Sequence, residues 1–125
     1  MLKEFQLKKC LKEMIFMLES VQDSRFSKSD DPVKDLRAMS VMISKIEKTG
    51  KLNQMVFLAK NLDYLSFEKR ILKPIKEYFK KFGASSEIWH GTRYSNPEMA
   101  KIMFFEGKSE LTSIIYHMKV DNYMY

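Results

Sequence analysis

The segment from Val33 to Phe82 constrains the fold of this chain most strongly, because its apolar residues recur every three or four positions. This spacing places them on one face of an α-helix and predicts a bundle of amphipathic helices. The segment contains 12 Lys and Arg but only 5 Asp and Glu, a net charge of +7, whereas the whole chain has +6. Such an excess favours an acidic partner. No catalytic motif occurs in the segment, which points toward a binding module.

Length and composition predict one all-α domain, a compact bundle of about five to six helices with short interhelical loops. The chain has 125 residues, with only 4 Gly and 3 Pro to interrupt helices. We expect an N-terminal helix over 1–22, a bundle core over 33–118 and a loosely held tail over 119–125. Cys10 is the single cysteine, so an intramolecular disulfide is impossible and an intracellular location is expected. No apolar run is long enough to cross a membrane, and no membrane partner is predicted.

Several residues mark where the helices should begin and end. Asp31 is expected to cap a second helix with Pro32 at its first position, and that helix should end at Thr49-Gly50. A third helix is predicted over 52–62. Ser66 should cap a fourth helix over 67–82, in which Pro74 must cause a kink or a break.

The C-terminal part predicts two further helices. Ser95 or Asn96 should cap the first of them, Gly107 should end it, and a last helix is expected over 109–118.

Lysines form a narrow stripe on the fourth predicted helix, opposite its apolar face. The stripe consists of Lys69, Lys73, Lys76 and Lys80. One interpretation is an ordinary solvated helix face, and the other is a docking surface for an acidic partner or a phosphate backbone. Nucleic acid is possible but not favoured, because the aromatic residues lie on the opposite face instead of among the lysines.

The turn before this helix carries two aromatic residues, Tyr64 and Phe67. At such a corner an aromatic side chain either covers the core or stands exposed as an anchor for a peptide. Both interpretations stay open from the residues alone.

The sequence offers little evidence for a metal site or a catalytic site. His90 and His117 are 27 positions apart and Cys10 is remote from both, so no metal site and no cofactor are predicted. Cys10 has lysine neighbours that could activate a thiol, but its helical position favours the core boundary. The run Trp89-His90-Gly91-Thr92-Arg93 resembles the strand of PARP-type ADP-ribosyltransferases that holds the nicotinamide cofactor. In that family a β-rich segment follows, whereas two helices are expected here.

Four stretches together resemble the N-terminal domain of transcription elongation factor TFIIS, a helical bundle shared with the Spt-six-binding elongation factor and the integrase-binding domain of LEDGF. The similar stretches are Lys34–Met39, Leu58–Tyr64, Ile71–Phe82 and Asn96–Leu111. This chain lacks the Trp that normally ends the closing helix of the family, and an aromatic loop over 83–95 replaces a small-residue turn.

The resemblance implies a non-catalytic, nuclear scaffold in transcription elongation. Such a scaffold would bind short motifs in which acidic residues flank a Phe. The implied contact residues lie in two loops, with the lysine stripe attracting the acidic flanks; they are Asp30 or Asp31 in the first loop and Tyr64 with Phe67 in the second. A fragment related to ADP-ribosyltransferases and a small pathogen or viral helical effector remain alternatives.

Overall fold

The computed structural model of the chain describes residues 2–23, 31–83 and 96–124, with side chains as far as residue 120. These residues lie in helices and the short turns between them and include no strand, which confirms the predicted all-α class. In chain order the helical elements are α1 (Leu2–Asp23), α2 (Pro32–Lys48), α3 (Lys51–Asn61), α4 (Leu65–Phe67), the π-helical turn η2 (Glu68–Leu72), α5 (Lys73–Phe82) and α6 (Pro97–Met124).

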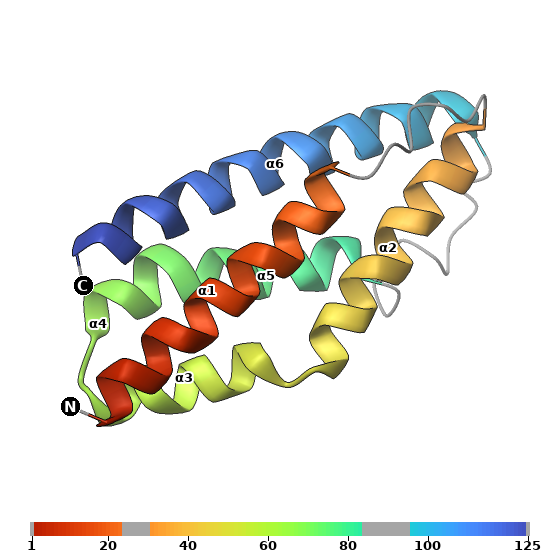
Figure 1. Cartoon of the computed structure of the whole chain (residues 1–125). Helices are drawn as coiled ribbons and strands as arrows, with labels where there is room; N and C mark the ends of the chain where they lie inside the picture. The colour runs from red at the N-terminus through yellow and green to blue at the C-terminus, as the bar shows by residue number, and fades with distance from the viewer. Residues whose placement is uncertain (1, 24–30, 84–95, 125) are drawn as a thin grey trace.

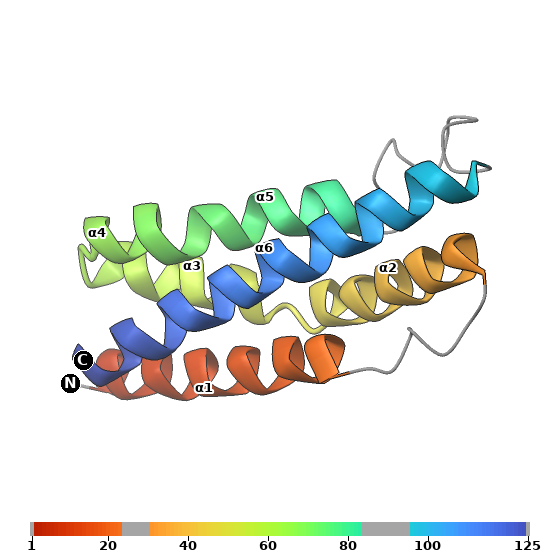
Figure 2. The same ribbon diagram turned by 90° about the horizontal axis from the view of Figure 1, so that it is seen from above.

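The longest helix, α6, organises the bundle. It packs against α1, α2 and α5, while α3 packs against α1 and η2 (Figure 1). α1 and α6 run in opposite directions, so the start of α1 and the end of α6 lie at the same end of the molecule (Figure 2). One hydrophobic cluster takes buried side chains from all seven of these elements. The described residues therefore share a single core.

The start of α2 and its junction with α3 follow the sequence signals. A carboxylate oxygen of Asp31 accepts hydrogen bonds from the backbone N–H groups of Val33, at 3.1 Å, and Lys34, at 3.3 Å. α2 ends at Lys48, and Gly50 then adopts a left-handed φ of 73°. Both the cap and the glycine junction are confirmed, because local side-chain and backbone chemistry determines them.

The predicted interruption at Pro74 is confirmed, and it takes the form of a π-helical turn. In η2 the Lys73 N–H donates to the carbonyl oxygen of Glu68, five residues back. The wider turn relieves the clash that a proline ring makes with the carbonyl four residues before it. The predicted Ser66 cap is wrong, because α4 begins at Leu65 and no side chain caps it.

The prediction that Gly107 ends a helix is wrong, since α6 runs unbroken from Pro97 to Met124. Gly107 is buried, and a Cβ atom there would lie 2.6 Å from Met39 Cε and 3.1 Å from Phe82 Cε1. The glycine thus lets α6 approach α2 and α5 closely, and this packing outweighs its low helix propensity. The predicted loose tail is helical as far as Met124, because α6 continues into it.

Candidate functional site

The four predicted lysines lie on the solvent side of η2 and α5. Lys69 belongs to η2 and the other three, Lys73, Lys76 and Lys80, to α5, and all four are exposed. The opposite face is buried in the core and consists of Ile71, Leu72, Ile75, Tyr78, Phe79 and Phe82. The two-faced character predicted for this segment is therefore confirmed.

Three of these lysines gather around a groove between α3 and the η2–α5 segment, which we call the basic groove. Its volume is about 290 Å³, and its lining residues are Val56, Lys60, Glu68, Lys69, Leu72, Lys73 and Lys76. Val56 is half-buried and Leu72 is buried, so the groove combines an apolar wall with charged rims. Lys80 is not among the lining residues.

The groove is strongly cationic. Four lysines and one glutamate line it, which gives a net formal charge of +3. Lys60 comes from α3 and is not part of the predicted stripe. Only the packing of α3 against η2 places it opposite Lys69 and Lys73. Nothing in the local sequence signals this meeting, because the two helices approach only through tertiary contacts.

A buried carboxylate oxygen lies within this cationic setting. Glu68 Oε1 is shielded from solvent and has no hydrogen-bond partner among the described residues. A buried acceptor without a donor is unfavourable, by about 1–3 kcal/mol or more for a charged group. The groove therefore holds one acceptor that a bound donor would satisfy, beside four cationic donors.

The Tyr64–Phe67 corner belongs mainly to the core. Phe67 is 2 % exposed, which agrees with the interpretation of a ring that covers the core instead of an exposed anchor. α4 packs against α3 and η2, and its Phe67 ring belongs to the hydrophobic core. Tyr64 is half-buried and packs against the core. Both rings line a small cavity of about 50 Å³ with residues of α1, namely Glu4, Leu7, Lys8 and Leu11.

The first-loop residues do not join this corner. Asp31 precedes α2, whose N-terminal end lies at the opposite end of the bundle from α4 (Figure 1). Its carboxylate is engaged as a helix cap. Asp30 lies outside the described residues. The two loops were expected to share one contact, but Asp31 and the Tyr64–Phe67 corner lie at opposite ends of the bundle.

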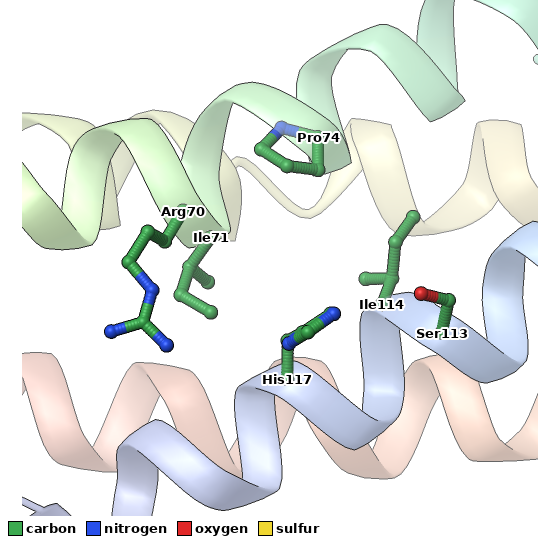
Figure 3. Close-up of a pocket in the computed structure, with 6 residues that line it drawn as sticks. All are labelled: Arg70, Ile71, Pro74, Ser113, Ile114 and His117. Atoms are coloured by element: carbon green, nitrogen blue, oxygen red, sulfur yellow. The ribbon is translucent and has the colours of Figure 1, made fainter.

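A second groove lies between η2–α5 and α6. Its volume is about 380 Å³ and its lining residues are Arg70, Ile71, Pro74, Ser113, Ile114 and His117. Figure 3 shows the first three reaching it from the η2–α5 side and the others from α6. An adjoining concavity shares three of these residues and continues to Glu77, Lys81 and Glu110. Together the two concavities carry Arg70 and Lys81 against Glu77 and Glu110, so they have no net formal charge and suit an acidic segment less well than the basic groove.

The structure gives no support to catalysis at Cys10. The thiol is 3 % exposed, and burial is the main cause that raises its pKa. A thiol held in its neutral form is a poor nucleophile. Within the described ranges no three His, Cys, Asp or Glu side chains are arranged to hold a metal ion. The Trp89–Arg93 run lies outside the described residues, and 97–124 after it form a helix where the ADP-ribosyltransferase family is β-rich.

No protein family, curated protein or solved structure matches the chain. Among the described helices none is long and apolar enough to cross a membrane.

Proposed function

We propose that this protein is a non-catalytic protein–protein interaction module whose basic groove binds a short acidic segment of a partner. The observation that carries the proposal is the convergence of Lys60, Lys69, Lys73 and Lys76 around one apolar-walled groove. Carboxylates of the partner would pair with the ammonium groups at the rims. An aromatic or aliphatic side chain between them would lie on Val56 and Leu72.

The size of the groove supports a motif rather than a large cofactor. A volume of about 290 Å³ lies at the lower limit of small-molecule pockets, which span roughly 300–1,000 Å³. Such a contact has the dimensions of one or two side chains. Binding is then weak, and because the lysines are exposed it falls as the salt concentration rises.

The biological setting rests on the resemblance to TFIIS N-terminal domains. We propose a nuclear scaffold in transcription elongation on that ground alone. The binding chemistry of the basic groove does not depend on this setting, so the two parts of the proposal are tested separately.

Selection from a displayed library of disordered peptides tests the binding chemistry. We expect the enriched peptides to be acidic and to contain an aromatic residue. The double variant Lys73→Glu/Lys76→Glu should weaken the best peptide about tenfold, since two attractive contacts become repulsive. Isothermal titration calorimetry at low and high salt measures the loss.

A matched control reverses the same number of charges elsewhere. Lys34 and Lys101 are exposed and lie near the N-terminal ends of α2 and α6, where glutamate is well tolerated. Lys34→Glu/Lys101→Glu should change the affinity less than twofold. Enriched peptides without acidic excess, or equal losses in both double variants, would contradict the proposal. Tighter binding of oligonucleotides than of any peptide, lost on Lys73→Glu/Lys76→Glu, would assign the groove to nucleic acid instead.

A further inference from the structure

Helix α1 presents a second regular row of side chains on the side that faces away from the core. We call this row the outer seam; it consists of Leu2, Phe5, Lys9, Lys12 and Phe16, all exposed. Its three apolar members are 72 %, 68 % and 73 % exposed in chain order. The core-facing row of the same helix is separate and consists of Leu7, Cys10, Leu11, Met14, Ile15, Leu18 and Val21. α1 therefore has two faces, of which the core uses one.

The spacing of the outer seam is that of a helix-pairing surface. Successive members are three, four, three and four residues apart, which is the a/d spacing of two helices that pack side by side. Large apolar side chains at these positions gain favourable free energy when a second helix covers them. The seam has the period that a second helix would match.

One ion pair lies on each side of the seam. Glu13 of α1 forms an ion pair with Lys51 of α3, and Glu19 pairs with Lys119 of α6. Both acidic residues flank the seam without belonging to it. The buried core-facing row determines which side of α1 faces outward, so a partner would meet a preformed surface.

The two central lysines determine which helix fits. Pairing with a second copy brings Lys9 against Lys9 in a parallel arrangement and against Lys12 in an antiparallel one. Both arrangements place like charges together in the seam, which is unfavourable. No acidic residue belongs to the seam. Carboxylates on the facing helix remove the repulsion and pair with both ammonium groups.

We propose that the outer seam of α1 pairs with an amphipathic helix of a partner protein that carries carboxylates opposite Lys9 and Lys12. The ends of that helix present apolar side chains to Leu2 and Phe5 at one end and to Phe16 at the other. This surface is distinct from the basic groove, to which α1 contributes no residue. The charges of Lys9 and Lys12 attract the carboxylates of such a helix and repel the same lysines of a second copy of this chain.

The probe is a synthetic helical peptide of about three heptads, long enough to pair along the seam. One version has Leu at the outer seam positions and Glu at the two central ones, and a second has Lys at the central positions. The wild-type chain should bind the Glu peptide at least about tenfold more tightly than the Lys peptide. Lys9→Glu/Lys12→Glu should reverse this preference, and calorimetry measures both affinities.

Two further variants separate the seam from general hydrophobic or charge effects. Phe5→Gln/Phe16→Gln should weaken the Glu peptide about tenfold. Ile102→Gln/Phe105→Gln removes two similarly exposed residues of α6 and should leave the affinity unchanged. Lys73→Glu/Lys76→Glu should also leave it unchanged, because the basic groove is not involved. Equal losses in the α1 and α6 variants, or no reversal of preference, would overturn the proposal.

Self-association gives an independent readout that needs no peptide. Lys9→Leu/Lys12→Leu makes the seam apolar throughout, and sedimentation equilibrium should show a larger mass than that of the wild type. Lys34→Leu/Lys101→Leu replaces two exposed lysines elsewhere and should keep the wild-type mass. An unchanged mass for the seam variant would show that the outer seam does not pair with helices.

Discussion

The hydroxyl of Tyr78 on α5 donates a hydrogen bond of 3.0 Å to the backbone carbonyl oxygen of Gly107 in α6. Both residues are buried. Burial raises the pKa of the Tyr78 hydroxyl well above its ordinary value, and the nearby charge of Glu110 raises it further. The Tyr78 hydroxyl therefore keeps its proton, and its hydrogen bond between α5 and α6, at a pH at which an ordinary tyrosine ionises.

Tyr78→Phe should destabilise the fold by about 1–2 kcal/mol, because the carbonyl oxygen of Gly107 loses its side-chain donor in a buried position. Urea unfolding followed by circular dichroism at neutral pH measures this loss. An unchanged free energy of unfolding would show that the hydrogen bond contributes nothing net.

The same residue should make stability depend on alkaline pH. The folded-state pKa lies above the unfolded value of about 10, so the folded state keeps a proton that the unfolded state releases. The contribution is fully present below about pH 10 and is lost as the pH rises further, by at most ~1.4 kcal/mol per pH unit. Tyr78→Phe should flatten this decline in urea titrations between about pH 8 and about pH 11. The hydrogen bond to Glu106 also raises the pKa of Lys81, and this effect is the same in both proteins. Parallel declines of the two proteins would therefore contradict the assignment to Tyr78.

Gly107→Ala should destabilise the protein although alanine is the better helix former. The new Cβ would lie 2.6 Å from Met39 Cε, at a flexible side-chain end, and 3.1 Å from the ring of Phe82. Overpacking costs about 1–3 kcal/mol, against a gain of about 1 kcal/mol in helix propensity. Ser109→Ala, at an exposed position of the same helix, should instead be neutral or slightly stabilising in thermal unfolding. A stabilised Gly107→Ala protein would show that the close approach is not required.

Asp63→Gly should stabilise the turn between α3 and α4. Asp63 has a left-handed φ of 58°. Its backbone N–H donates to the carbonyl oxygen of Lys60 at 3.2 Å, and the backbone N–H of Tyr64 donates to the carbonyl oxygen of Ala59 at 2.9 Å. This is the hydrogen-bond pattern of a Schellman C-cap, where glycine is preferred. We expect a gain of about 0.5 kcal/mol with Gly and a loss of similar size with Ala. Equal stabilities of the two variants in urea unfolding would contradict this.

Local signals predicted the parts of the fold that depend on a few neighbouring residues. Asp31 caps α2 because its side chain reaches N–H groups two and three positions ahead. Pro74 interrupts a helix because its own ring and missing N–H act on the preceding turn. The prediction at Gly107 was wrong because the glycine is required by close contact with Met39 and Phe82, which are distant in sequence.

The candidate site divides in the same way. The sequence by itself determined that the segment is two-faced and that Lys69, Lys73 and Lys76 share one side, since helical periodicity follows from spacing alone. Only the tertiary structure decided that Lys60 joins them, that Phe67 turns inward and that the outer seam of α1 is left uncovered. The physical reason is that periodicity gives each helix its faces, whereas the packing of helices against one another selects which faces become core, groove or surface.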